Sequence, residues 1–305
     1  MHYPKDIRQA LKRYNKITRI KNDSIKSLYY YFLRKLKKEK HMNLNVENKV
    51  AILTAATDGL ALATAKQLLS EGARVAICGR DEKRNADAHA ALSQLSNENN
   101  FLVFSCDVTD KTQIEKFVLA AVEKFSQIDI VVTNAGGPPT GTFETIALDM
   151  YEKAFQLTLM SVVHFVQAAL PYLKKSETPS VLTITSIAAK EPIPNLFMSN
   201  VIRPAVIGLT KTLSQELGVY GIRVNSILPG WTATDRTIYL LNNRAEKLNS
   251  TYEACEKEVV KNIPLKRMGT PQEFANVAAF LVSPAASYVN GVMMQVDGGA
   301  YMGLM

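Results

Sequence analysis

Seven short runs of apolar and β-branched residues recur along the chain from Lys49 onward. None shows the strict alternation of apolar and polar side chains that a half-exposed strand has, so each predicts a strand that is buried on both faces. The runs are Val50–Ala55, Arg74–Gly79, Phe101–Val108, Ile128–Ala135, Ser180–Ser186, Ile222–Leu228 and Val292–Val296.

Longer segments with apolar residues at helical spacing separate these runs. Examples are Leu60–Ser70, Lys111–Phe125, Met150–Leu173 and Leu196–Gly218. A regular alternation of buried strands and helices predicts an α/β fold with a Rossmann-type, doubly wound parallel sheet of about seven strands. We find no linker or internal repeat after residue 48, so residues 42–305 are predicted to form a single domain.

The positive charge of the chain is concentrated at its amino end. Residues 1–41 hold 13 of the 36 lysines and arginines and 3 of the 28 acidic residues, which leaves 23 basic and 25 acidic residues in the remainder. The net charge of +8 therefore belongs to this basic N-terminal extension. A nearly neutral body argues against a nucleic-acid partner for the domain.

The extension itself has apolar residues at helical spacing among lysines and arginines, which predicts a basic amphipathic helix. One interpretation is an arm that contacts a membrane surface or nucleic acid, and another is a targeting presequence, although the segment is rich in lysine and poor in serine. We favour a solvated tail, or upstream sequence ahead of a natural start at Met42. The apolar residues are Ile25, Leu28, Tyr29, Phe32, Leu33 and Leu36.

The composition sets further limits. Hydrophobic residues make up 47% and charged residues 21% of the chain, as in soluble globular proteins. No apolar run reaches the roughly 18 residues of a membrane span. The three cysteines, Cys78, Cys106 and Cys255, and the four scattered histidines form no disulfide framework or metal-binding spacing. We therefore expect a cytoplasmic protein without a metal site; a small-molecule substrate is expected only from the resemblance described below.

Ligands of an open parallel sheet bind beyond the carboxyl ends of its strands. The first such end carries the turn TAATDGLA, from Thr54 to Ala61. Gly59 lets the backbone approach a pyrophosphate, and the following helix directs its N-terminus at the phosphates. Alone, one glycine flanked by Ala55 and Ala61 is a weak signal for nucleotide binding.

The other strand ends strengthen that signal. Asp107-Val108, Asn134-Ala135-Gly136, Ser186 and Pro229-Gly230 follow successive strands, and a block from Pro264 to Gly299 closes the chain. In this order and spacing, the residues resemble the short-chain dehydrogenase/reductase family, and most closely its 3-oxoacyl-[acyl-carrier-protein] reductase-like branch. The resemblance covers roughly Asn48 to Gly299.

The resemblance implies a nicotinamide cofactor, a homotetramer or homodimer, and a substrate lid at about residues 231–266. In the lid, Trp231, Tyr239 and Leu240 either line the substrate pocket or serve ordinary packing. The resemblance also assigns cofactor contacts at the carboxyl edge of the sheet. These are Thr54, Gly59 and Leu60 at the pyrophosphate, Asp107 and Val108 at the adenine, Asn134, Ala135 and Gly136 at the nicotinamide ribose, Pro229 and Gly230 behind the nicotinamide, and Thr232 or Thr234 at its amide or the phosphates.

The residue after the second strand distinguishes NAD from NADP. An acidic residue there would bind the ribose 2′-hydroxyl, whereas this chain has Arg80, whose planar guanidinium suits a 2′-phosphate. Asp58 argues in the opposite direction, because related NADP enzymes often carry a basic residue at that position. We therefore expect NADP(H), with NAD(H) as the alternative.

The catalytic pattern departs from that of the family. The resemblance implies a tyrosine thirteen residues after Ser186 and a lysine four residues further on, but this sequence has Ser199 and Arg203. Thr158 stands where a helix asparagine is common. We predict Ser186, Ser199 and Arg203 as the catalytic group, with Arg203 also contacting the nicotinamide ribose.

A serine hydroxyl is a far weaker acid than a phenol beside a cation, so the proton donor is an open question. Candidates are Lys190, Glu191 and a water held by Ser186 and Ser199. Pro204, inside the predicted helix, would remove the hydrogen bond to the Asn200 carbonyl.

Three functions follow from the sequence. We favour an NAD(P)(H)-dependent oxidoreductase that transfers hydride between the cofactor and a carbonyl or alcohol. The loss of the tyrosine and lysine keeps open a cofactor-binding protein without dehydrogenase activity, acting as a sensor or an oligomer subunit. A third hypothesis is a body tethered to a surface by its basic arm.

Overall fold

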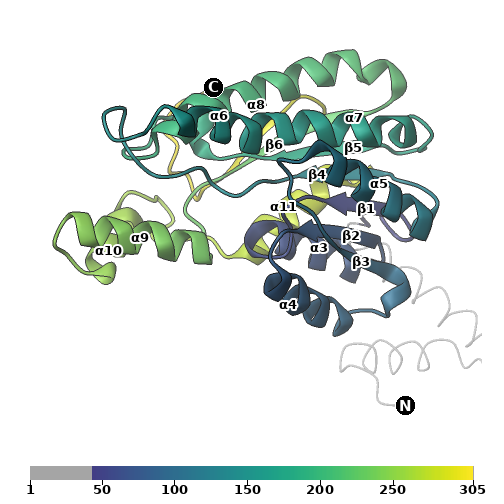
Figure 1. Cartoon of the computed structure of the whole chain (residues 1–305), viewed down its shortest axis with the longest axis horizontal. Helices are drawn as coiled ribbons and strands as arrows, with labels where there is room; N and C mark the ends of the chain where they lie inside the picture. Colours follow the sequence, from purple (N-terminus) through teal and green to yellow (C-terminus); the bar gives the residue numbers. More distant parts are fainter. Residues whose placement is uncertain (1–42, 305) are drawn as a thin grey trace, which may run out of the picture. The chain divides into compact units, whose positions relative to one another are not determined.

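The computed structural model describes residues 43–304, so the predictions for residues 1–41 lie outside the described part. Seven strands form one parallel sheet in the order β3-β2-β1-β4-β5-β6-β7 (Figure 1). The order reverses between β1 and β4, as in the predicted doubly wound fold. The strands are β1 Val50–Leu53, β2 Arg74–Gly79, β3 Phe101–Ser105, β4 Ile130–Thr133, β5 Ser180–Ile184, β6 Arg223–Pro229 and β7 Met293–Val296.

All seven predicted runs are strands, and several stop earlier than predicted at their carboxyl ends. β1 stops at Leu53, because the chain then turns toward the neighbouring strands, with Thr54 N–H donating to Val132 O and Ala56 N–H donating to Cys78 O. The residues beyond the strands are thereby released from the ladder and line its carboxyl edge.

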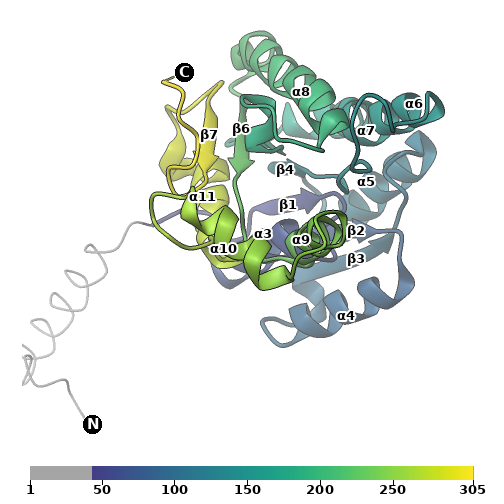
Figure 2. The same ribbon diagram turned by 90° about the vertical axis from the view of Figure 1, so that its left-hand side faces the viewer.

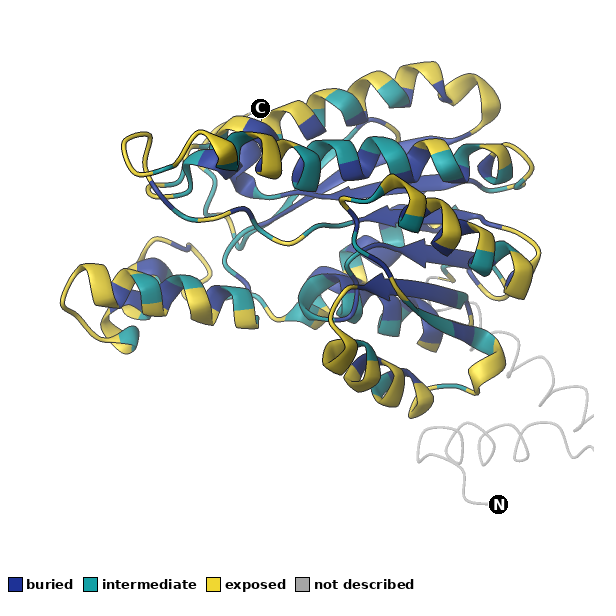
Figure 3. Cartoon of the chain, in the orientation of Figure 1, coloured by how far each residue is buried: buried dark blue, intermediate teal, exposed yellow. Residues whose placement is uncertain are grey.

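Helices cover both faces of the sheet (Figure 2). Ala51 and Leu53 of β1 face one hydrophobic cluster, and Val50 and Ile52 face the other, as the two-residue period of a strand requires. Figure 3 shows the resulting pattern of buried strands and helices whose outer sides are exposed. One layer is α3 Gly59–Ser70, α4 Glu82–Ser93 and α11 Pro271–Val282, and the other is α5 Lys111–Phe125, α7 Ser161–Leu173 and α8 Phe197–Glu216.

The segment predicted as one helix over Met150–Leu173 is interrupted, which corrects the sequence prediction. It consists of α6 Asp149–Phe155, a π-helical segment η2 Gln156–Met160, and α7. A π-turn inserts one extra residue into a helix and often marks a functional position. Here it contains the buried Thr158. The remaining short helical turns are η1 Glu98–Asn100, η3 Ile187–Ala189, η4 Gly218–Tyr220 and η5 Pro284–Ala286.

The same stretch, Asp149–Leu173, is long and apolar enough to cross a membrane by length and composition alone, with a mean hydropathy of 1.3. Within α7, however, Val162, Phe165 and Val166 are buried in the sheet-facing cluster, and Phe165 stacks on Phe117 of α5. These contacts are those of a core helix.

Helices α9 Asp235–Lys247 and α10 Tyr252–Lys261 project from the carboxyl edge of the sheet and contain a small core of their own (Figure 1). Trp231 packs against this core, which favours the packing interpretation of that side chain. The two ends of the segment are joined, because Thr232 forms a β-bridge with Gly269. The segment that holds α9 and α10 therefore begins and ends at this β-bridge, which we call the stem.

Arg223 at the start of β6 connects the sheet to the end of α11. Its guanidinium donates to the carbonyls of Leu281, Val282, Ser283 and Val289 at 2.7–3.3 Å. Burial lowers the pKa of Arg223, and the carbonyls at the helix C-terminus carry the negative end of the helix dipole. One buried cation therefore supplies a donor to the carbonyls of Leu281 and Val282 and adds a second donor to those of Ser283 and Val289, which also accept from Ala286 N–H and Asn225 Nδ2.

We expect Arg223→Met to destabilise the fold by about 3 kcal/mol or more, because a side chain of similar length leaves the buried carbonyls of Leu281 and Val282 without the donor that Arg223 supplies. Urea denaturation measures the loss. The matched control, Arg244→Met on the exposed surface of α9, should change the free energy of unfolding by less than about 0.5 kcal/mol. Equal effects of the two substitutions would contradict the assigned role.

Candidate cofactor and substrate site

The turn between β1 and α3 is open toward the carboxyl edge of the sheet. Gly59 has φ +58°, and a Cβ added to it would meet no atom within 4 Å. Asp58 caps α3 by accepting from Gly59 N–H at 2.6 Å. Ala55 also adopts a positive φ, +43°, which strains a residue that has a Cβ. This turn has the space and the helix N-terminus that a bound pyrophosphate needs.

Thr54 and Asn134 fasten the ends of β1 and β4 to each other. Thr54 Oγ1 donates to Asn134 O at 2.8 Å and accepts from Asn134 N–H at 2.9 Å, and Asn134 Nδ2 donates to Ala55 O at 2.8 Å. The crevice at the reversal point of the sheet is therefore built rigidly. The sequence analysis assigns both residues to the cofactor site. The structure shows that they also form hydrogen bonds with each other.

Arg80 and Asp107 meet at the ends of β2 and β3, where their side chains form an ion pair at 3.4 Å. Partial burial opposes ionisation of Asp107, but hydrogen bonds from Thr109 and Arg80 outweigh it and hold the pKa of Asp107 below its usual value. Arg80 is largely exposed, with 75% of its side-chain surface accessible. It can therefore turn toward an anion without a large desolvation cost.

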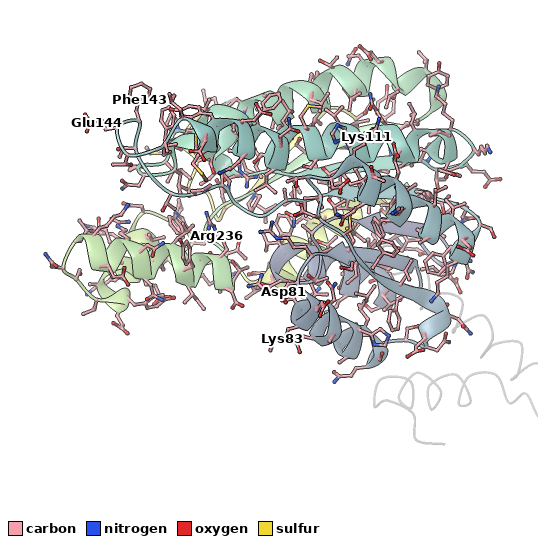
Figure 4. The ribbon with its side chains drawn as sticks, in the orientation of Figure 1. Asp81, Lys83, Lys111, Phe143, Glu144 and Arg236 are labelled. Atoms are coloured by element: carbon pink, nitrogen blue, oxygen red, sulfur yellow. The ribbon has the colours of Figure 1, made fainter. Side chains whose placement is uncertain are left out.

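Arg84, which the sequence analysis missed, lies on α4 one turn after Arg80. Its guanidinium pairs with Asp58 at 3.2 Å. The negative charge of Asp58, which argues against a 2′-phosphate, is thereby neutralised by Arg84. The signal available in the sequence was a second arginine four residues after Arg80, in the first turn of the helix that follows β2. Asp81, labelled in Figure 4, is the N-cap of α4 and lies between the two arginines in the sequence.

Arg203 of α8 lines a cavity of about 10 Å³, room for about one water molecule. Its Nε atom is buried without a hydrogen-bond partner among residues 43–304, as are Thr133 Oγ1 and Thr158 Oγ1 in the same lining. Asn134 and Ala135 form another wall, so the cavity adjoins the predicted cofactor crevice. Burial, and then the charge of Arg236, lower the pKa of Arg203 to about 10.

The two predicted serines lie on elements that contact each other. Ser186 caps η3, with its Oγ accepting from Ala188 N–H at 3.1 Å, and η3 packs on α8. Ser199 lies one turn before Arg203 on α8 and is buried. Asn200, missed by sequence analysis, holds this region together by exchanging two hydrogen bonds of 2.9–3.0 Å with the backbone of Ile193.

The other candidate proton donors occupy different surroundings. Lys190 places its ammonium over the ring of Tyr301 at 5.5 Å, and so has a partner in the C-terminal segment. Glu191 is partly buried and forms no ion pair within residues 43–304. Helix α8 continues through Pro204 without ending. Neither Lys190 nor Glu191 lines the cavity beside Arg203.

The remaining predicted cofactor residues follow strand ends along the same edge. Gly136 faces open space, since an added Cβ would meet nothing within 4 Å. Gly230 packs directly on Asp297, and Thr232 is buried in the stem before α9. Leu60 is partly buried at the start of α3, and Val108 is buried after β3. Pro229 ends β6 and is buried.

Arg236, which no sequence motif indicated, reaches from α9 to the loop after β4. Its Nη2 donates to Pro138 O at 3.0 Å, its guanidinium packs on Gly137, and it lies over the ring of Tyr239 at 5.3 Å. Figure 4 shows Arg236 on the side of the molecule where the loop carrying Phe143 and Glu144 lies. Partial burial lowers the pKa of Arg236.

Among residues 43–304, no group of three or more His, Cys, Asp or Glu side chains is arranged to hold a metal ion. Besides the carboxylates of Asp58 and Asp107, the polar groups of the edge are hydroxyls, amides and guanidinium groups, which suit the phosphates and hydroxyls of a nucleotide.

The family model described as Enoyl-(Acyl carrier protein) reductase matches residues 54–301. Dehydrogenase/reductase SDR family member 4 of Oryctolagus cuniculus is 34% identical over 254 residues, which are 83% of this chain and 94% of the relative. The chain belongs to the short-chain dehydrogenase/reductase family. Its activity is that of an NAD(P)-dependent oxidoreductase acting on carbonyl or alcohol groups.

Two solved structures of short-chain dehydrogenases/reductases have the same fold. L-sorbose reductase from Gluconobacter frateurii, complexed with NADPH and L-sorbose, has 27% identity and a TM-score of 0.81 over 86% of this chain and all of that chain. An NADPH-bound short chain oxidoreductase from Pseudomonas aeruginosa PAO1, described as containing an atypical catalytic center, has 30% identity and a TM-score of 0.77 over 84% and 99%.

We expect Ala55→Gly to stabilise the protein by about 0.5–1 kcal/mol, because glycine adopts the left-handed conformation without a Cβ clash. Thermal denaturation measures the change. The matched control is Ala56→Gly at the adjoining buried position, where φ is not positive, and it should destabilise instead. A loss of stability in Ala55→Gly would show that the turn is not strained.

Proposed function

We propose that this short-chain dehydrogenase/reductase uses NADP(H) and that Arg203 takes over the electrostatic part of catalysis. The observation that carries the proposal is the Arg203 guanidinium, whose buried Nε has no hydrogen-bond partner in the described part of the chain and lies at a cavity walled by Asn134 and Ala135. A cation in such a place stabilises negative charge much better than one in water, and no carboxylate of residues 43–304 lies within 4.0 Å to neutralise it.

The preference for NADP(H) is supported by the charges at the ends of β2 and β3. Arg80 is exposed, and the acidic Asp58 is paired with Arg84. Two guanidinium groups therefore flank the position where a ribose 2′-phosphate would lie. Both reductases compared above were solved with NADPH.

When bound, the cofactor supplies or accepts the hydride. The chain orients the substrate oxygen with the hydroxyls of Ser186 and Ser199, and Arg203 stabilises the negative charge that develops on that oxygen. An arginine is not a proton donor near neutral pH. We assign the proton to water, and the unpartnered hydroxyls of Thr133 and Thr158 provide a place for one molecule beside Arg203.

The cytoplasmic location, the homo-oligomeric assembly, the 3-oxoacyl-[acyl-carrier-protein] reductase-like branch and the closing lid remain proposals. Exposed apolar side chains near α6 and on α8, namely Leu148 and Val201, support self-association. Light scattering on the purified protein gives the number of subunits.

We expect Arg80→Asp to weaken NADPH binding by roughly 30-fold or more and NADH binding by less than about threefold, because only the former loses a guanidinium–phosphate pair. Fluorescence titration of both cofactors measures the constants. Lys83→Asp, on the exposed surface of α4, is the control for charge alone. Parallel losses for both cofactors in Arg80→Asp would refute the assignment.

The pH dependence of kcat tests whether turnover depends on the positive charge of Arg203. Its positive charge is present below its pKa of about 10 and is lost above it, so kcat should be flat from about pH 7 to 9 and fall above pH 10. The same burial would lower the pKa of a lysine at this position below that of Arg203, because the ordinary pKa of lysine, about 10.4, is already below that of arginine. Arg203→Lys should therefore move the fall of kcat to lower pH, whereas an unmoved profile would exclude Arg203 as the controlling group.

One experiment separates activity from cofactor binding alone. NADPH binding is measured first, followed by turnover with ketones, 3-oxoacyl thioesters and sugars. Binding with turnover of at least one class is expected. Binding without turnover of any class would favour the alternative of a sensor or oligomer subunit.

A further inference from the structure

Two arginines at the substrate side of the crevice have no acidic partner. Arg203 comes from α8 and Arg236 from α9, and within residues 43–304 no carboxylate oxygen lies within 4.0 Å of either guanidinium. They share the segment that follows β4, since Ala135 lines the cavity of Arg203 and Gly137 contacts Arg236. Like charges gathered without counter-charge in a partly buried place favour an anion as ligand.

The guanidinium of Arg236 is fixed in place but not saturated. Its Nη2 donates to Pro138 O, and one face of the guanidinium lies over the ring of Tyr239. A guanidinium has five N–H donors, so most remain for a ligand. Because the backbone and the ring already hold the side chain, little conformational entropy remains to be lost on binding.

The position of Arg236 favours a substrate over the cofactor phosphates. The pyrophosphate site predicted from the sequence is the turn between β1 and α3, where Gly59 is open. Arg236 lies instead against Gly137 and Pro138, beyond the end of β4, and projects from the helical segment that is predicted to close over the substrate. Figure 4 shows it between that segment and the rest of the domain.

We propose that the substrate of this enzyme carries a carboxylate in addition to the reacting carbonyl, and that Arg236 binds this carboxylate. The inference rests on the proposed oxidoreductase function. In the reductive direction the carbonyl carbon gains a hydride from NADPH, its oxygen gains a proton from water, and the carboxylate is unchanged. Small oxo acids are therefore the substrate class, and Arg236 is the specificity-determining residue.

The test compares pairs of substrates that differ only in charge. Acetoacetate and 4-oxopentanoate are each measured against their methyl esters with NADPH. The wild type should prefer at least one acid over its ester by tenfold or more in kcat/KM. A charge-assisted pair contributes roughly 1.5–3 kcal/mol, which is about 10- to 150-fold.

Arg236→Gln should lower kcat/KM for the preferred acid by about 10- to 100-fold, mainly through KM, and change that for the ester by less than about threefold. Arg236→Lys should recover part of the loss, because it restores the charge without the planar fork. Arg244→Gln, on an exposed position of the same helix, controls for the change in net charge and should behave as wild type.

Two measurements separate the possible failures. NADPH affinity should be unchanged in Arg236→Gln, and a loss of tenfold or more would assign Arg236 to the cofactor and overturn the proposal.

Butyrate should bind the NADPH-loaded wild type by calorimetry, and butanamide should not. This arm needs no turnover, so inactive protein that binds butyrate through Arg236 refutes the proposed function alone. Equal turnover of acid and ester refutes the substrate class alone.

Discussion

Burial of the sheet on both faces is the constraint on which the rest of the structure depends. With helices packed above and below, the backbone of every strand must find its partners within the sheet. Only where the strands stop can side chains and free amides meet a ligand. The chain ends β1 and β4 early, and the bonds between Thr54 and Asn134 then hold these released residues in place.

Much of this arrangement could be predicted from the sequence, because it depends on local patterns. The seven apolar runs identified the strands, and the predicted cofactor residues lie along one edge as expected for parallel strands. The interruption at Gln156–Met160 was not predictable in this way. An apolar helix and an apolar helix with one extra residue have almost the same periodicity, and only tertiary packing distinguishes them.

The contacts of charged residues were even harder to predict from the sequence. Arg80 was recognised from its place after a strand, whereas Arg84 and Arg236 were not, since neither belongs to a motif. Arg236 lies 98 positions beyond Pro138 in the chain, and its bond to that carbonyl follows from the fold alone. In the sequence, Asp58 argues against NADP. In the structure its carboxylate is paired with Arg84, so this argument loses its force.

The π-helical segment gives Thr158 its place at the cavity, and this has a consequence for how the site can change. Each residue of a regular α-helix advances the direction of the next side chain by about 100°. A π-turn takes up its extra residue within one turn, so the side chains of α6 and α7 keep the directions that they would have in one continuous helix. Deleting one residue from Gln156–Met160 would therefore restore a regular helix and redirect only the side chains of the bulge, Thr158 among them. The bulge is thus a place where a single deletion changes the cavity and leaves the core packing of α7 intact.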